Sequence, residues 1–443
     1  MKLNALLFPA LALLSLLPWA QQPELPPSPV GRPPFMWGVT LSDYQNDGAT
    51  PSMDWYQLER SGKLPERSGH SADFRDNETA DLDRAESLGL NAFCTSIEWA
   101  RLEPRPGYFD PKEVAYLHHL FAAIHARGMT PVVTLHHFVS PEWIYKDDGD
   151  GLVAWENPRT VAAYVKYVAF VAKEFGAQID YYLTINEPST LIGGGYVLGW
   201  VQPHLTGVFP AYRAAQNIIA AHIGAYKAIH RLDPVAHVSL PEYNALVPVA
   251  DGGVNYMPGE WLNFFLDKED GWDGRPRSKY LDFVAVHYYG AVDTQAASTF
   301  PVEPYRWGVN PQDFATVLHS YYQTYHLPIM VTENGCATDN DTPRADGWSR
   351  EAYLVQHIKV LEQVKAEGVP IMGYFYWTLT DNYEWGSFSP RFGLWRVDVL
   401  SGDLTRHATP LVAVYRNIIR HNGVTPALLA KFPPPATTTA ALN

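Results

Sequence analysis

The 443-residue sequence predicts an α/β protein built as a single closed (β/α)8 barrel. Eight short runs rich in β-branched and aromatic residues alternate with stretches mostly long enough for a helix, and no linker separates the first run from the last. Polar and aromatic residues gather at the carboxyl end of nearly every run. A doubly wound open sheet is the competing architecture, but polar groups at so many strand ends are typical of the TIM barrel, whose active sites lie on that rim.

The predicted strands and helices follow one another in a regular order. The strands are FMWGVTLS (35–42), AFCTSIEW (92–99), TPVVTLHH (130–137), DYYLTINE (180–187), HVSLPEYN (237–244), FVAVHYY (283–289), PIMVTEN (328–334) and GYFYWTLT (373–380). Helical patterns over 77–90, 111–128 and 157–176 precede the second, third and fourth strands. In the last of these helices, Asn157 is expected as the N-cap, Pro158 at the first helical position, and Gly176 just past the end.

The two ends of the chain differ in composition from the barrel. Lys2, a following apolar run and the small residue Ala20 indicate a secretory signal peptide, and we expect a secreted or periplasmic protein without membrane insertion after cleavage. An uncleaved anchor is the alternative, although the apolar run is short for a bilayer. The expected boundaries are a signal peptide at 1–20, a proline-rich linker at 21–34, the barrel at 35–425 and a disordered tail at 426–443.

The composition argues against some partners and permits others. The formal net charge of -14 comes without a basic block, which argues against nucleic acid and favours a neutral or cationic partner. The 14 Trp and 26 Tyr residues permit stacking on sugar rings, although core packing is the more ordinary use of aromatic side chains. A disulfide between Cys94 and Cys336 is a less favoured alternative, because the ends of the second and seventh strands are expected to lie across the barrel from each other, beyond about 7 Å. Nothing in the sequence predicts a cofactor, a metal site or an oligomeric state.

Two glutamates stand at predicted strand ends, Glu187 in TINEP and Glu333 in VTENG. On a barrel both side chains would project from the same rim. Cleavage of a glycosidic bond with retention of configuration needs two carboxyl groups about 5 Å apart, one to protonate the leaving oxygen and one to attack the anomeric carbon. Either motif alone is a weak signal, because an acidic residue at a strand end is more often a helix cap. The pair predicts Glu187 as acid/base and Glu333 as nucleophile.

Five segments make the chain resemble glycoside hydrolase family 1, the β-glucosidase family, over residues 35–422. They are FMWGVTLSDYQNDGA, TLHHF, TINEP, VTENG and GYFYWTLTDNYEW. The resemblance implies a retaining, exo-acting, β-glucosidase-like enzyme that removes terminal β-linked neutral sugars by double displacement, with no cofactor.

The same resemblance implies roles for individual side chains. Asn186 would bind the 2-hydroxyl of the sugar, where hydrogen bonds strengthen in the transition state. Tyr289 would hydrogen-bond Glu333 and help to keep it ionised. Trp377 would lie beneath the sugar, and Trp307 would line the leaving-group side. The other predicted sugar-binding residues are Gln45, His137, Glu384 and Trp385.

Some polar residues are expected to have no part in the chemistry. His136 and His137 are neighbours on a strand and should point to opposite faces, so only one can face the barrel interior and a metal site is not expected. Asp381 and Arg391 are interpreted as structural ion-pair or capping groups.

Three positions depart from the family pattern: Cys94 stands where Arg is normal, Phe138 where Trp is common, and His287 where Asn is common. Without the Arg, a cation that would lower the pKa of Glu333 is missing. The sequence does not decide whether Cys94 merely enlarges the pocket or impairs the enzyme, so a weakly active or non-catalytic carbohydrate-binding relative is one alternative. The other is a transglycosylase, in which an alcohol takes the sugar from the same covalent intermediate.

The glutamate pair also predicts how activity depends on pH. The charge of Glu333 and burial should raise the pKa of Glu187, so that Glu187 is protonated when substrate arrives and the rate profile is bell-shaped. Glu384 occupies a position where phosphate-specific relatives use a Ser and Lys pattern, and a carboxylate would repel phosphate. Neutral glucosides, galactosides or fucosides are therefore expected, without a choice among them.

Overall fold

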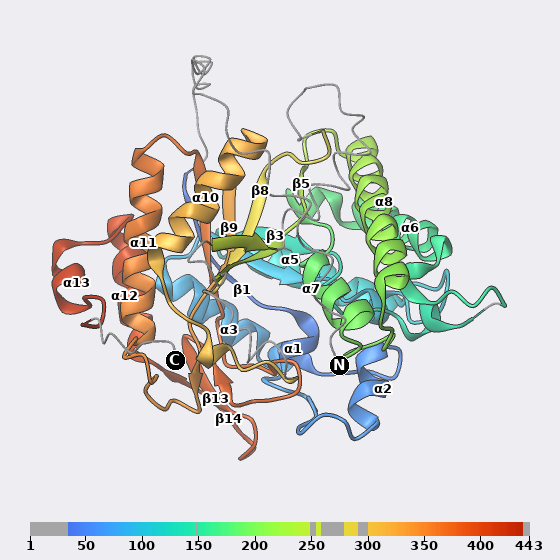
Figure 1. The fold of residues 1–443 in the computed structure, drawn as a ribbon, viewed down its shortest axis with the longest axis horizontal. Helices are drawn as coiled ribbons and strands as arrows, with labels where there is room; N and C mark the ends of the chain where they lie inside the picture. The colour runs from blue at the N-terminus through green and yellow to red at the C-terminus, as the bar shows by residue number, and fades with distance from the viewer. Residues whose placement is uncertain (1–33, 148, 249–253, 258–278, 291–299, 437–443) are drawn as a thin grey trace. The chain divides into compact units, whose positions relative to one another are not determined.

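A computed structural model describes residues 34–147, 149–248, 254–257, 279–290 and 300–436. These residues form a curled parallel sheet surrounded by helices, so the predicted fold class is confirmed (Figure 1). The barrel strands are β1 (Met36–Thr40), β2 (Ala92–Ser96), β3 (Thr130–Thr134), β4 (Tyr181–Leu183), β5 (His237–Ser239), β6 (Glu242–Pro248), β8 (Val284–Tyr288), β9 (Ile329–Asn334) and β11 (Ile371–Trp377). Neighbours pair in the order β5-β4-β3-β2-β1-β11-β9-β8-β6, and β7 (Val254–Met257) adds an antiparallel partner to β6.

The ring of strands closes through the segment predicted as one strand at 237–244. This segment is two strands instead: β5 pairs with β4, and β6 pairs with β8. The break falls at Pro241, which has no N–H to give to a sheet ladder. Ser239 links the two sides, because its hydroxyl donates to the Phe283 carbonyl over 2.7 Å and accepts from the Ala285 amide over 3.1 Å.

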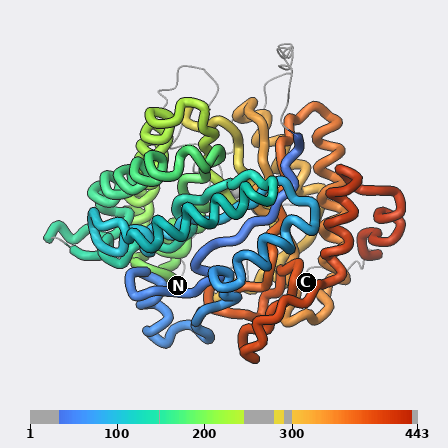
Figure 2. The backbone as a smooth tube through the Cα atoms, turned by 180° about the vertical axis from the view of Figure 1, so that it is seen from behind, coloured from blue at the N-terminus to red at the C-terminus, as the bar shows by residue number. Residues whose placement is uncertain are grey.

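Helices cover the outside of the barrel. Figure 1 shows α6 and α8 side by side on one flank and α10, α11 and α12 on the other, and from behind the blue and cyan helices α3 and α5 lie over the strands (Figure 2). The main helices are α3 (Phe74–Leu88), α5 (Pro111–Ala126), α6 (Pro158–Phe175), α8 (Val208–Leu232), α10 (Pro311–Tyr325), α11 (Arg350–Ala366) and α12 (Pro410–His421). The predicted start of α6 is confirmed, since the Asn157 side chain accepts from the Arg159 amide and Pro158 opens the helix.

Short elements connect these helices and strands. They are α1 (Asp43–Asp47), α2 (Asp54–Arg60), α4 (Trp99–Leu102), α7 (Pro188–Ile192), η4 (Gly193–Val197), α13 (Pro426–Lys431), and the hairpin of β13 (Trp395–Asp398) with β14 (Asp403–Ala408). Two of them adjoin the strand-end rim: α1 contains Gln45, and α7 directly follows Glu187.

The barrel interior is a small apolar core of its own. Met36, Phe375 and Met330 from neighbouring strands pack there with Cys94, whose side chain is completely buried. Cys336 belongs to a separate cluster, and both thiols are free, as the sequence predicts. Cys94 is therefore a packing residue of the interior that lies beneath the strand-end rim.

The structure describes only part of the two chain ends for which a signal peptide, a linker and a disordered tail are predicted. The predicted disordered tail at 426–443 is wrong for its first part, because the chain beyond 426 forms helix α13. Leu428, Leu429 and Phe432 order this segment by burying apolar surface on the barrel. Residues 437–443, the predicted signal peptide and nearly all of the predicted linker lie outside the described residues. Among the helices that the structure describes, none is both long and apolar enough to cross a bilayer.

Candidate active site

The two glutamates lie at the carboxyl ends of non-adjacent strands, and their side chains approach each other. Glu333 belongs to β9, and Glu187 follows β4 as the residue that precedes α7. Pro188 opens α7, and Glu187 itself has a left-handed backbone with φ 40°. Residues with side chains adopt this conformation rarely and mostly where the surroundings hold them, which is frequent at active sites. Both carboxylates are buried, and an oxygen of each lies with His287 Nδ1 in a group of three atoms that are within 4.8 Å of one another.

His287, on β8, stands between the glutamates. Its Nδ1 is 2.7 Å from Oε1 of Glu187 and 3.3 Å from Oε2 of Glu333. Two carboxylates and an imidazole are also groups that metals accept, and these three are the described residues close enough to hold one. The contact with Glu187 is a hydrogen bond, and the longer contact with Glu333 is an ion pair when the imidazole is protonated.

Tyr289 completes the surroundings of Glu333. Its hydroxyl donates to Oε2 of Glu333 over 2.7 Å, the contact expected from the sequence. A donor on the charged form stabilises a carboxylate, so this bond favours ionised Glu333. Tyr353 holds the Tyr289 backbone in turn by donating to its carbonyl over 3.1 Å.

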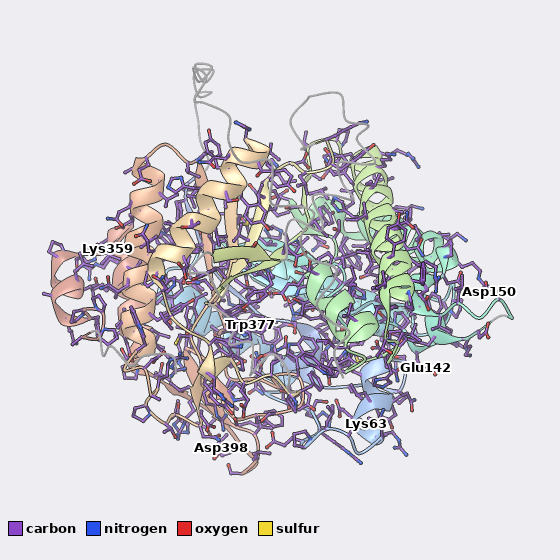
Figure 3. All side chains as sticks on the ribbon, in the orientation of Figure 1. Lys63, Glu142, Asp150, Lys359, Trp377 and Asp398 are labelled. Carbon is purple, nitrogen blue, oxygen red and sulfur yellow. The ribbon has the colours of Figure 1, made fainter. Side chains whose placement is uncertain are left out.

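Three predicted sugar-binding residues form one hydrogen-bonded network. The indole of Trp377 donates to Oε1 of Glu384 over 3.0 Å, and the amide of Gln45 donates to Oε2 of Glu384 over 3.2 Å. Ser42 fixes the amide of Gln45 by donating to its oxygen over 2.8 Å. Trp377, labelled in Figure 3, lies near the middle of the described unit, whereas the labelled charged residues Lys63 and Asp150 lie at its periphery.

Burial and the hydrogen-bonded network have opposite effects on the pKa of Glu384. Burial raises the pKa of Glu384 to about 8, against the opposing effect of the bonds from Trp377 and Gln45. With this raised pKa, Glu384 carries less negative charge near neutral pH. It therefore repels phosphate less than the sequence predicts for a fully charged carboxylate.

The histidine pair divides as predicted. His136 points away from the cavity, with its Nε2 2.9 Å from the Ser140 hydroxyl and its ring edge-on to Trp155. His137 lines the cavity, with its ring parallel to those of Trp377 and Trp385. Burial holds the pKa of His137 well below its usual value, so its imidazole is neutral.

Several buried polar atoms of the site have no partner among the described residues. They are Nδ1 of His137, Nδ2 and Oδ1 of Asn186, and Nε2 of His287. Buried polar groups are nearly always hydrogen-bonded, so atoms without a protein partner beside a cavity are suited to bind a ligand or water. Of these residues, His137 lines the cavity.

The cavity above the glutamates has a volume of about 320 Å³. Toward the glutamates it is lined by Gln45, His137, Trp377 and Glu384, and Trp385 and Trp307 also reach it, so each of these predicted side chains faces one space. Apolar side chains make up much of the remaining wall, and they include Trp55, Phe138, Leu198, Trp200, Val201 and Phe300. None of the described residues on this wall is Lys or Arg.

Opposing influences act on the charge of Glu333. Burial raises its pKa to about 7, with the charge of Glu187 adding to the rise and His287 and Tyr289 opposing it. Burial also raises the pKa of the Cys94 thiol to about 12, so the residue that replaces the expected Arg is neutral. Keeping Glu333 ionised thus depends on His287 and Tyr289.

Sequence reasoning missed two kinds of site residue. Glu242 on β6 accepts from the amide and hydroxyl of Ser189, over 3.2 and 3.0 Å, and so supports the turn that carries Glu187. In the sequence, Glu242 lies within the predicted strand at 237–244, and no motif marks it as a site residue. The apolar wall residues Trp200 and Phe300 come from loops, where no periodic pattern marks them. Asp381 and Arg391 form the expected structural pair, 3.6 Å apart and buried.

Comparison with known proteins identifies the family. The family model described as Glycosyl hydrolase family 1 matches residues 32–253 and 284–424, which is most of the chain. The chain belongs to glycosyl hydrolase family 1. Within this family it is 28% identical to a β-galactosidase of Sulfolobus acidocaldarius, with 90% of this chain and 97% of that protein covered. It is 25% identical to β-glucosidase A of Thermotoga maritima, with coverage of 88% and 98%.

Solved structures of family 1 enzymes share the fold. The β-glycosidase from Pyrococcus horikoshii superposes with a TM-score of 0.75 at 29% identity, covering 90% of this chain and 96% of that one. The family 1 protein described here is thus a glycosidase of the retaining β type. Of its departures from the family pattern, His287 contacts both glutamates and Cys94 lies in the barrel interior beneath them.

Proposed function

We propose that this family 1 protein hydrolyses terminal β-linked neutral sugars, with Glu187 as acid/base and Glu333 as nucleophile. The observation that carries the proposal is the spacing of the two carboxylates, whose nearest oxygens lie with His287 Nδ1 within 4.8 Å of one another. Retaining enzymes hold their carboxyl groups about 5 Å apart, whereas inverting enzymes need a wider gap for water. The buried, unpartnered atoms of Asn186 and His137 support sugar binding beside this pair.

The reaction follows from this geometry in two steps. Glu187 gives its proton to the glycosidic oxygen while a carboxylate oxygen of Glu333 attacks the anomeric carbon, which yields the free aglycone and a glycosyl ester. Glu187, now ionised, takes a proton from water, and the water oxygen attacks the anomeric carbon and releases Glu333. Each inversion cancels the other, so the sugar keeps its configuration.

The cavity wall supports a preference for an apolar leaving group. The wall beyond the sugar-binding residues includes Trp200, Phe300 and Leu198, and the rings of Trp200 and Phe300 stack at 5.9 Å. An aryl or alkyl aglycone buries apolar area there, whereas a second sugar would leave its hydroxyls facing carbon. We propose neutral β-glycosides with apolar aglycones as the substrate class.

A labelling experiment tests the catalytic assignment. A panel of aryl β-glucosides, galactosides and fucosides identifies the sugar, and the 2-deoxy-2-fluoro analogue of the best substrate traps the glycosyl ester for peptide mapping. We expect time-dependent inactivation with the label on Glu333 and none on the buried carboxylate of Glu242. A label elsewhere would refute the assignment. Products formed with an added alcohol measure how much of the sugar is transferred rather than hydrolysed.

We also propose that the protein is exported, on the basis of the apolar run after Lys2 and of Ala20. Amino-terminal sequencing of the protein recovered from a secreting host tests this. A mature chain that begins close to Gln21 supports export with cleavage, and an intact Met1 in the cell fraction contradicts it.

A further inference from the structure

The most unusual feature of the site is the position of His287. Its imidazole is almost completely buried, and Nδ1 lies 2.7 Å from Glu187 and 3.3 Å from Glu333. One N–H can therefore donate to either carboxylate. The family commonly has Asn here, which could donate a hydrogen bond but could not become positively charged.

In the described part of the chain, no Lys or Arg supplies a positive charge to the cavity wall. The position where the family normally has Arg is Cys94, whose thiol is neutral and lies within electrostatic reach of Glu333. Two buried carboxylates without a cation would repel each other and tend to bind protons, which would suppress the nucleophile.

The groups around His287 favour its protonated form. The charges of Glu333 and Glu187 raise its pKa by more than burial lowers it. Among the described residues, His137, which follows β3, is a basic group that interacts with His287, and burial holds the pKa of His137 well below its usual value. The titratable groups that face the cluster are Glu187 after β4, Glu242 and Tyr243 on β6, Tyr289 after β8, Glu333 on β9, Glu384 after β11 and His137 after β3.

We propose that His287 is a catalytic residue, an imidazolium that carries the positive charge missing at Cys94 and pairs with whichever glutamate is ionised. The inference rests on the proposed function, because it assigns a role within the two-step reaction of Glu187 and Glu333. In this arrangement His287 on β8 supplies the positive charge that is missing at Cys94 on β2.

The negative charge moves from Glu333 to Glu187 during the first step, and His287 lies close to both. Before the first step Glu333 is negative and Glu187 carries the proton; after it, Glu333 is an uncharged ester and Glu187 is negative. Nδ1–H of His287 is within hydrogen-bond reach of both, so one cation stabilises the site before and after the charge shifts. A cation at position 94 adjoins Glu333 and would serve mainly the first state.

The test replaces His287 by the residue that is common in the family. In His287→Asn the cation is lost, so the pKa of Glu333 should rise and the acidic limb of the kcat/KM profile should move up by about one pH unit, with a loss of up to about 10-fold at pH 6. His136→Asn is the matched control, because His136 is equally buried but contacts Ser140 instead of the carboxylates. It should leave the acidic limb in place.

A second substitution restores a cation at the family position. In His287→Asn with Cys94→Arg, the acidic limb should return toward that of the unchanged enzyme. Loss of activity in His287→Asn without any shift of the limb would overturn the proposal, because a purely structural role lowers the rate without moving the titration. If His287→Asn does not fold by circular dichroism, His287→Gln takes its place with the same expected shift. EDTA in every assay removes adventitious metal.

The inference and the proposed function can fail separately. Labelling of Glu333 by the fluorinated glycoside in the unchanged enzyme establishes the nucleophile before the variants are compared. If Glu333 is not labelled, the proposed function fails. If it is labelled but the limb does not move in His287→Asn, only the role of His287 fails.

Discussion

The hydroxyl of Tyr289 donates a 2.7 Å hydrogen bond to Oε2 of Glu333. His287 Nδ1 is 3.3 Å from the same oxygen, so one carboxylate oxygen has two potential donors while burial pushes the pKa of Glu333 upward. Neighbours on β8 and just after it thus favour the ionised form of Glu333, the proposed nucleophile, where the family normally has an arginine on β2.

Removal of the Tyr289 hydroxyl should weaken the nucleophile. A hydrogen bond to a charged group contributes about 1.5 to 3 kcal/mol, so Tyr289→Phe should lower kcat/KM for an aryl glycoside about 10- to 100-fold and move its acidic limb to higher pH. Tyr288→Phe is the control, since Tyr288 donates to the Asn310 carbonyl and not to the glutamate. Equal losses in both variants would show that the Tyr289 bond has no special role.

Replacement of the acid/base should affect substrates according to their leaving groups. In Glu187→Ala we expect the first step to slow by about 100- to 10,000-fold for alkyl glycosides, which need a proton, and much less for dinitrophenyl glycosides. Azide should restore turnover by taking the sugar from Glu333, and nuclear magnetic resonance should identify a β-azide. In Glu333→Ala the azide product should be the α-anomer. The opposite pairing of variants and anomers would exchange the two roles.

The apolar wall should contribute to binding of the aglycone alone. Phe300 contacts the rings of Trp200 and Trp55, with centroids 5.9 and 6.3 Å away. Phe300→Ala should raise KM for an octyl or naphthyl glycoside about 5- to 20-fold, because less apolar area is buried. KM for the same sugar with a methyl aglycone should change less than about twofold. A similar rise for both substrates would place Phe300 against the sugar instead.

The stability of the fold should depend on pH through Glu242. Burial and the charge of Glu187 raise the pKa of Glu242 to about 8. The unfolded chain releases this proton near its ordinary pKa of about 4.3, so the folded state binds more protons between the two values, and stability falls as pH rises through that window. In Glu242→Gln this dependence is absent, and its Tm should exceed that of the unchanged protein by an amount that grows between about pH 5 and pH 8.

A surface variant provides the comparison for Glu242→Gln. Glu86 on α3 is exposed, so Glu86→Gln should give a Tm difference that stays constant with pH. Each unit of pKa difference corresponds to about 1.4 kcal/mol, which makes the gain for Glu242→Gln at pH 8 on the order of a few kcal/mol at most. Parallel curves for all three proteins would contradict a buried, protonated Glu242.

The amino-acid sequence by itself determined the barrel, the start of α6 and the positions of Glu187 and Glu333, because strand patterns, capping residues and motifs at strand ends are local signals. It also identified Cys94 and His287 as departures. It could not place them relative to Glu333, since β2, β8 and β9 are far apart in the chain and belong to one ring of strands only in the folded barrel. Tertiary structure alone decided that His287 lies between the glutamates, that burial raises the pKa of Glu333, and that Trp200 and Phe300 share one wall. These properties depend on distance and exclusion of water, which no local pattern encodes.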